Sequence, residues 1–527
     1  MLLSCALLGG LLLASPQKPA MGEDPARAFF AKLPFVQVHI ELTEASRQDL
    51  RERPREYVTA TLQLDGTTFS PVGIKLKGAA GSTREFDDRP GFTVHFGKFG
   101  GTGAFHGLRR FHLNNGIQDD SRLSEWLGHE VFARAGYPAP RVAHARVREG
   151  NRDLGVYVFR EAFDQQFVRR VFGDQAGNLY DGGFCQDVDQ DLEKDAGDGP
   201  DDHSDLRALA AHCSGVNRDR LQQLDAALDL DRFLDFAALE AMLGHWDGYT
   251  RNANNFRLFL PTGGRACFLP HGMDQLLQDT EASILEHPPA IVASAVMQQP
   301  ALRKRYRERL RALLPLFAPD TLRARLDAIA DSLQAQWKAI DEDGARAHAD
   351  AVTSLRQRLA ARYRDLQVQV KAPEPKPLQL TIGRPLPQKN WHPAAETERV
   401  EIAKKSFQSA TSLYVHCIDR GEEPRRGVWR THVLLGKGRY ELRGTARCAD
   451  VDSPAKDQDG TEHGGVCLRA GDGVSARLSG NANWTPLVCE FEVGEFQRSV
   501  ELACDVHAFV GKAWFRFDSL VLVRVGE

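Results

Sequence analysis

Apolar and polar residues alternate in short runs between about Phe35 and Phe96. The runs are VQVHIEL, TATLQL, VGIKLKG and FTVHF, and Gly, Pro and Asp separate them. Successive side chains of a strand point to opposite faces, so this period of two predicts an antiparallel sheet. Further along, VAHARVR and LGVYVFRE predict another hairpin.

Helical periods follow in three places. RLSEWLGHEVFARA repeats apolar residues at helical spacing, with Asp120 or Ser121 as the expected N-cap and Gly136 as the stop. DRFLDFAALEAMLGHW has the length and period of a buried helix. Residues 300–370 carry Arg, Leu, Ala and Gln at helical periods, which predicts two or three amphipathic helices.

The prolines of KAPEPKPLQLTIGRPLP block regular helix and predict a linker over residues 371–390. Beyond it, YELRGTARC, WTPLVCEFEV, SVELACDV and AWFRFDSLVLVRV alternate strongly, which predicts a jelly-roll-like β-sandwich over residues 391–527. Trp429, Trp484 and Trp514 are either core residues or exposed platforms for sugar rings. At 527 residues the chain exceeds one hydrophobic core, so we expect an α+β domain over residues 30–370 before the sandwich.

The charge balance excludes nucleic acid as the main partner. Lys and Arg total 67 against 71 for Asp and Glu, and the net charge of -4 leaves no basic excess to cover a phosphate backbone. Residues 187–205 are rich in Asp and Glu and predict a solvated surface loop, with a calcium site as the alternative.

The first residues predict export. LLSCALLGGLLLA is too short to span a membrane and is followed by the loop-like SPQKPA, which is typical of a signal peptide over residues 1–20. A buried N-terminal helix is the alternative. We expect a secreted, periplasmic or cell-surface protein without an integral membrane segment. Removal of Cys5 leaves eight cysteines, which are compatible with disulfides in an oxidising compartment or with buried free thiols.

The strongest local signal is HWDGYTRN, residues 245–252, because it has the H-x-D-x4-N spacing of a kinase catalytic loop directly after a helix. Two short strands follow, FRLFL and ACFL, and then Asp274 within PHGMD. A hairpin that returns an Asp beside the catalytic loop is where a kinase positions its metal-binding Asp. Alone, the segment is also typical of an Asp that caps a turn and of Asn residues that shape a loop.

These residue types fit phosphoryl transfer. The transferred group is anionic, so a divalent metal must neutralise it while a carboxylate orients the incoming hydroxyl. Asp247 is the predicted orienting base. Asp274 and Asn252 are predicted to hold Mg²⁺ through hard oxygen ligands, with Asn255 as a competing amide ligand.

A cation for the ATP phosphates is predicted on the strand VGIKLKG, whose apolar residues face one way and whose Lys75 and Lys77 face the other. Lys77 is the better positioned lysine, because the small-residue turn from Gly78 to Ser82 follows and its backbone amides could approach phosphate closely. Glu125, on the next predicted helix, is the acid expected to fix that lysine. The alternative is a lysine that faces water.

The ordered segments resemble the CotH kinase family, the spore-coat-protein-H type, from about residue 55 to residue 280. An ordinary protein kinase is excluded, because the G-x-G-x-x-G loop and the V-A-I-K strand are both absent. The segments that carry the resemblance are GIKLKGAAGS, FHGLRRFHLNNGIQDDSRLSEWL, AGYPAP, LGVYVFREAFDQQF, GNLYD, HWDGYTRNANNFRLF and LPHGMDQLL.

The resemblance implies an atypical kinase-like fold and a secreted enzyme that uses ATP with Mg²⁺ or Mn²⁺ to phosphorylate Ser or Thr of an extracellular or envelope protein. It implies Asp247 as catalytic Asp, Asp274 as metal-binding Asp and Lys77 as the phosphate lysine, with Arg89 as a second basic residue and Glu125 as the helical acid. Many members carry D-x-D at the metal segment, whereas Gly272 stands here at the first position. The alternative is therefore an inactive cell-surface scaffold whose sandwich binds polysaccharide or a protein.

Overall fold

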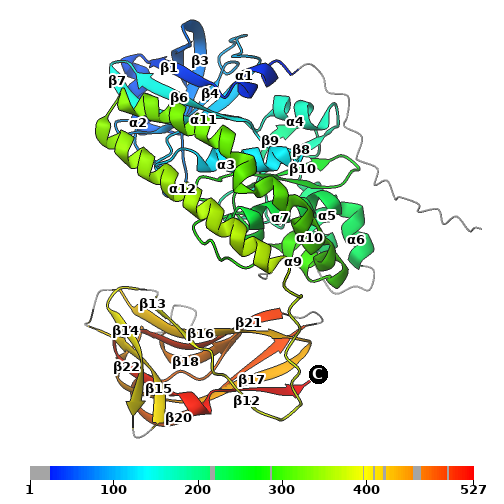
Figure 1. Cartoon of the computed structure of the whole chain (residues 1–527), viewed down its shortest axis with the longest axis vertical. Helices are drawn as coiled ribbons and strands as arrows, with labels where there is room; N and C mark the ends of the chain where they lie inside the picture. The colour runs from blue at the N-terminus through cyan, green and yellow to red at the C-terminus, as the bar shows by residue number, and fades with distance from the viewer. Residues whose placement is uncertain are drawn as a thin grey trace, which may run out of the picture. The chain divides into compact units, whose positions relative to one another are not determined.

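The computed structural model describes residues 24–213, 220–284, 288–395, 397–407, 410–418, 420, 423–454, 464–494 and 498–527. The chain divides into two compact units, Met1–Lys371 and Ala372–Glu527, which are drawn in Figure 1 and are described separately. The expected signal peptide, residues 1–20, lies outside the described residues. None of the described helices combines the length and the apolar character that a membrane crossing requires.

The first unit begins with a closed barrel in the strand order β1-β2-β3-β4-β5-β7-β6. Every neighbouring pair is antiparallel except β1 with β6. The expected antiparallel sheet is therefore present, but closure by a parallel pair was not predicted, because alternation within a strand does not say which edge strands meet. The strands are β1 Phe35–Glu41, β2 Val58–Leu64, β3 Thr67–Lys77, β4 Gly91–His95, β5 Arg110–Asn114, β6 Val142–Glu149 and β7 Arg152–Glu161.

A second sheet, in the order β11-β10-β8-β9, follows the barrel. Its strands are β8 Gly177–Asp181, β9 Glu193–Gly197, β10 Phe256–Pro261 and β11 Cys267–Pro270. The prediction that residues 187–205 form only a solvated loop was wrong, since β9 lies within this range and Asp187 is buried. Asp187 accepts a hydrogen bond from the Tyr249 hydroxyl at 3.0 Å, and such bonds permit the burial of a carboxylate.

Helices complete the first unit, and the long pair α11 and α12 lies side by side in Figure 1. The expected amphipathic helices over residues 300–370 are α10, α11 and α12. The N-cap prediction for α3 was wrong, because the helix begins at Ser124, whose amide donates to Asp119 at 2.8 Å. The helices are α1 Arg27–Ala31, α2 Glu44–Glu52, α3 Ser124–Arg134, α4 Gln165–Phe172, α5 Ser204–Cys213, α6 Arg220–Ala227, α7 Leu230–Met242, α8 Tyr249–Asn252, α9 Ile291–Met297, α10 Pro300–Leu313, η1 Leu314–Phe317, α11 Pro319–Lys338 and α12 Glu342–Gln369.

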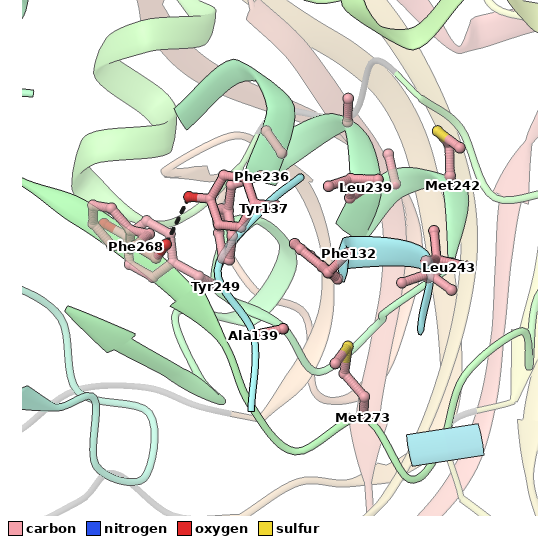
Figure 2. Packing of buried hydrophobic residues seen from close by; sticks show 14 of the residues in the cluster. Phe132, Tyr137, Ala139, Phe236, Leu239, Met242, Leu243, Tyr249, Phe268 and Met273 are labelled. Carbon is pink, nitrogen blue, oxygen red and sulfur yellow. Dashed lines mark hydrogen bonds between the residues drawn. The ribbon is translucent and has the colours of Figure 1, made fainter. Parts of the chain in front are cut away.

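One apolar core joins α3, α7 and the loops that follow α7 and β11 (Figure 2). Phe132 of α3 packs edge-on against Tyr137, and the Tyr137 hydroxyl donates to the Phe268 carbonyl at 2.6 Å. Tyr249 and Met273 are fully buried in the same core. Each of these two residues therefore anchors a loop that carries predicted site residues.

The second unit is a sandwich of two sheets, in the orders β12-β23-β17-β22-β15-β14, with β20 also paired to β17, and β13-β16-β21-β18-β19. The predicted β-sandwich is thus observed. Trp429 is buried in its core, whereas Trp514 packs against Tyr414 with ring centroids 5.2 Å apart. The elements are β12 Leu386–Pro387, β13 His392–Ala395, β14 Val400–Phe407, β15 Ala410–Cys417, β16 Arg425–Leu435, β17 Gly438–Asp452, β18 Gly465–Ala470, β19 Gly473–Val474, β20 Gly480–Val493, β21 Arg498–Ala508, β22 Val510–Arg516, η2 Phe517–Ser519 and β23 Val521–Gly526.

The eight cysteines of the described residues are all free thiols. Cys185 is exposed and the other seven are buried. The alternative of buried free thiols therefore describes seven of them, and burial raises the pKa of the Cys467 thiol to about 12.

We expect Arg362→Met to lower the free energy of unfolding by about 3 kcal/mol, because it would remove several buried hydrogen bonds to backbone carbonyls and the ion pair with Asp365. The Arg362 guanidinium is fully buried and donates to the carbonyls of Ala241 at 2.5 Å and Ala282 at 2.6 Å. Chemical denaturation measures the loss. Arg364→Met, at an exposed position of the same helix, is the control, and an equal loss in both variants would contradict the role of Arg362.

Candidate functional site

A cavity of about 810 Å³ lies where the barrel meets the second sheet and the loops after α7 and β11. Barrel strand β3, helix α3 and both loops contribute to its wall. The cavity brings together most of the residues that the sequence predicted for the site: Lys77, Gly78, Ser82, Glu125, Asp247, Asn252, Asn255 and Asp274.

Three amides hold the Asp247 carboxylate. The side-chain nitrogens of Asn252 and Asn254 donate to Oδ1 at 2.6 and 3.1 Å, and that of Asn255 donates to Oδ2 at 2.7 Å. Asn255 also donates to the Asp247 carbonyl at 3.0 Å. Because each amide nitrogen is used by Asp247, the amide oxygens of Asn252 and Asn255 are the atoms that would ligate a cation.

Glu240 of α7 holds the start of the loop that carries Asp247 through three hydrogen bonds. The fully buried carboxylate accepts from the amides of Tyr249 at 3.1 Å and Thr250 at 2.9 Å, and from the Thr250 hydroxyl at 2.7 Å. Burial raises the pKa of Glu240 to about 7. A Cβ at Gly248 would lie 2.5 Å from Glu240 Oε1, so this close approach requires glycine.

Two histidines connect the loop after α7 to the loop after β11. His245 Nε2 lies 3.0 Å from the carbonyl oxygen of His271. Nδ1 of His271 lies 2.5 Å from an Arg160 guanidinium nitrogen on β7. Burial holds the pKa of His271 well below its usual value, so the ring is neutral and its Nδ1 can accept from the arginine.

Asp274 provides the carboxylate that would bind a divalent cation. Burial and the negative charge of Glu125 raise the pKa of Asp274 to about 6, while the positive charge of Lys77 lowers it. A carboxylate that is desolvated and repelled by a second acid is stabilised by a bound cation. The described residues contain no group of three His, Cys, Asp or Glu side chains arranged for a metal.

Asn255 occupies the space next to Gly272. A Cβ on Gly272 would lie 2.1 Å from Asn255 Oδ1 and 2.3 Å from its Cγ, and Gly272 has a φ of +57°. A side chain at position 272 would therefore displace the Asn255 amide from Asp247.

Lys77 reaches Glu125 through an intermediate residue. The ammonium donates to Asn114 Oδ1 at 2.5 Å, and Asn114 Nδ2 donates to Glu125 Oε2 at 2.7 Å. Arg160 lies 3.5 Å from Glu125 Oε1. Burial and the charge of Arg160 lower the pKa of Lys77 to about 7, against the opposing effect of Glu125.

Arg89 is the one predicted site residue that does not line the cavity among the described residues. Its guanidinium donates to the Val156 carbonyl at 2.8 Å and lies 5.7 Å from the Trp337 ring centroid. Gly78 and Ser82 do line the cavity, in the turn after β3, where the Ser82 hydroxyl accepts from the Ala79 amide at 3.1 Å.

Sequence reasoning missed Asn114, Arg160, Asn254 and Glu240. A charged residue within the otherwise apolar strand LGVYVFRE was the available signal for Arg160. The available signal for Glu240 was an acid within an otherwise apolar helix. Asn114 and Asn254 carried no such signal, because asparagines are common in turns.

Comparison with known proteins gives one family. The model described as CotH kinase protein matches residues 74–362, which is more than half of the chain. No curated protein matches the chain.

Two of the solved structures that align with part of the chain are carbohydrate-binding modules. The carbohydrate-binding module TmCBM61 in complex with β-1,4-galactotriose has 12% identity and a TM-score of 0.18, over 25% of this chain and 88% of that one. The family 11 carbohydrate-binding module of the cellulosomal cellulase Lic26A-Cel5E of Clostridium thermocellum has 12% identity and a TM-score of 0.15, over 27% of this chain and 96% of that one. Values this low support no functional comparison.

We expect Gly272→Ala to destabilise the protein more than Gly263→Ala. Both glycines have a left-handed φ, of +57° and +66°, so alanine costs about 1 kcal/mol or more at each. Only at Gly272 would the new Cβ displace a neighbour, since nothing lies within 4 Å at Gly263. Loss of the Asn255 bonds adds about 1 kcal/mol or more, which paired thermal unfolding measures. Equal losses would mean that Asn255 is not held at Gly272.

We expect Glu240→Gln to change how stability depends on pH. The folded-state pKa of Glu240, about 7, lies above the ordinary 4.5, so the folded protein binds the proton more tightly than the unfolded chain does. The stabilisation that this tighter proton binding gives the folded protein is complete below pH 4.5 and is lost as pH rises to about 7. Over that range the free energy of unfolding falls by at most about 1.4 kcal/mol per pH unit.

Denaturant unfolding at several pH values measures this slope in the wild type, Glu240→Gln and the control Glu308→Gln, which alters an exposed glutamate of α10. Glu240→Gln should remove this part of the slope, and Glu308→Gln should not. A slope unchanged in Glu240→Gln would contradict the assignment.

Proposed function

Because the chain belongs to the CotH kinase family, we propose that it transfers the γ-phosphoryl group of ATP to a Ser or Thr hydroxyl of an extracellular or envelope protein. One observation carries the proposal. The Asp247 carboxylate, held by three amides, lines the same cavity as Lys77 and Asp274. A carboxylate that orients a hydroxyl, a lysine for phosphate and an acid for metal are the parts that phosphoryl transfer requires.

Asp247 accepts the hydrogen bond of the incoming hydroxyl in this mechanism. The hydroxyl oxygen forms a bond to the γ-phosphorus while the bond from that phosphorus to the β,γ-bridging oxygen breaks, and ADP leaves. The hydroxyl proton passes to Asp247 and then to solvent. The three amides keep the carboxylate aimed into the cavity during the step.

Lys77 binds the phosphates. Its pKa of about 7 is depressed by burial and by Arg160, so an anionic triphosphate beside it would favour the charged ammonium. Asp274, Asn252 and Asn255 would hold Mg²⁺ or Mn²⁺, which supplies charge neutralisation of the phosphoryl oxygens when bound. Asn114 positions Lys77 and Glu125 relative to each other through its two hydrogen bonds.

An inactive scaffold is the second candidate, and one observation favours it. The metal ligands would include a single carboxylate, Asp274, since Gly272 supplies none and the other donors are neutral amides. Fewer charged ligands bind Mg²⁺ more weakly. The polysaccharide partner of such a scaffold and its secreted location stay predictions. In the sandwich, Arg447 lies over the Trp514 ring, 5.1 Å from its centroid, on a face of the ring that a stacking sugar would need.

We expect Asp247→Asn and Asp274→Asn each to lower the rate of transfer from labelled ATP by at least about a hundredfold. The reasons are the loss of the orienting base and the loss of the metal-binding carboxylate. Label on casein or on the chain itself, with Mg²⁺ or Mn²⁺ present, is the measurement. Calorimetry on the same variants separates a loss of ATP binding from a loss of transfer.

Asp279→Asn is the matched control, because Asp279 is an exposed acid in the same segment as Asp274. It should leave the rate unchanged. Transfer that survives Asp247→Asn would contradict the catalytic role of Asp247. A wild-type chain that neither transfers label nor binds ATP in a metal-dependent way would favour the scaffold.

A further inference from the structure

Two exposed aromatic side chains lie on the wall of the cavity. Large aromatic rings contribute much apolar area, so their exposure beside a cleft indicates a contact surface. Among the described residues three Phe or Trp side chains are exposed: Phe99 at 40%, Phe184 at 66% and Trp246 at 46%. Phe184 and Trp246 line the cavity, and Phe99 does not.

Chain adjacency and one asparagine connect both aromatic residues to Asp247. Trp246 directly precedes Asp247 in the chain. Phe184 directly precedes Cys185, whose amide donates to Asn254 Oδ1 at 3.2 Å, and Asn254 Nδ2 in turn donates to Asp247 at 3.1 Å. The backbone at both aromatic residues is therefore connected to the loop that carries Asp247, and both side chains line the cavity that contains this carboxylate.

We propose that Phe184 and Trp246 bind an apolar side chain adjacent to the accepting Ser or Thr of a protein substrate, and so determine which hydroxyls reach Asp247. The inference rests on the proposed kinase function, because that function makes Asp247 the acceptor side of the cavity. Burial of an aliphatic side chain against exposed aromatic rings contributes binding energy, whereas burial of a charged side chain there costs energy.

A nucleotide base is the other planar ligand that aromatic rings could stack on. The position of the two rings disfavours a nucleotide base as their ligand. Asp247 must lie beside the γ-phosphate, and the base is at the opposite end of the triphosphate, so a ring next to Asp247 is nearer to the acceptor than to the base.

Alkylation of Cys185 tests the proposal without any transfer step. Cys185 is the exposed thiol of the described residues, it lines the cavity and it follows Phe184. The full chain is treated with iodoacetamide in the presence of a glycine-rich peptide that contains Leu-Ser-Leu, or of the same peptide with Asp-Ser-Asp. The Leu peptide should slow alkylation at a lower concentration than the Asp peptide.

The double variant Phe184→Ala/Trp246→Ala should raise the Leu peptide concentration for half-protection by about tenfold, and leave the alkylation rate without peptide and the Kd for ATP unchanged. Phe99→Ala, at an exposed ring outside the cavity, is the control and should change nothing. The double variant should fold, because Phe184 and Trp246 are exposed at 66% and 46% and lie outside the hydrophobic core.

Equal protection by the two peptides, or unchanged protection in the double variant, would overturn the proposal. A weaker Kd for ATP with unchanged peptide protection would overturn it in favour of base stacking. Peptide protection in a chain that transfers no label would leave this surface intact and would count against the kinase function alone.

Discussion

The Asp247 carboxylate is the group around which the rest of the site is arranged. A half-buried anion requires donors, and three asparagine amides from the same loop supply them. The loop can turn these amides toward one carboxylate because Ala253 and Asn255 adopt left-handed backbone conformations, with φ of +47° and +49°. Such conformations are costly outside glycine, so the core beneath must hold them, and buried Tyr249 and Met273 connect both site loops to that core (Figure 2).

Charge balance is the second constraint, because the cavity contains cations and anions that are poorly solvated. The charges of Arg160, Glu125 and Asp274 affect the pKa of Lys77, and those of Glu125 and Lys77 affect the pKa of Asp274. Asn114 separates Lys77 from Glu125, so the lysine does not form the direct ion pair that an ordinary kinase uses. Arg160 contacts Glu125 instead. The pKa of Lys77, lowered to about 7, makes its ammonium easier to deprotonate, and an anionic ligand beside it would favour the charged form.

Local sequence patterns predicted those features that are determined by residues close together in the sequence. The alternating strands, the helices over residues 300–370 and the spacing of Asp247 and Asp274 are all of this kind. Barrel closure by β1 with β6, the bond from Lys77 to Asn114 and the contact of Arg160 with Glu125 join segments far apart in the sequence, which periodicity does not report. Arg89 was assigned by resemblance alone, and its guanidinium packs against Trp337, away from the cavity.

A glycine in place of a metal-binding carboxylate is easily interpreted as a loss of function, but the packing around Gly272 suggests a structural reason for it. The Asn255 amide fills the space that any side chain at position 272 would need, so the two positions compete. A carboxylate at 272 would also add negative charge near Asp274, whose pKa is already raised by Glu125. An amide oxygen offers a cation the same hard donor atom without that repulsion. Asn255 in place of a carboxylate at position 272 would therefore lower the negative charge beside Asp274 and would leave Asp274 easier to ionise.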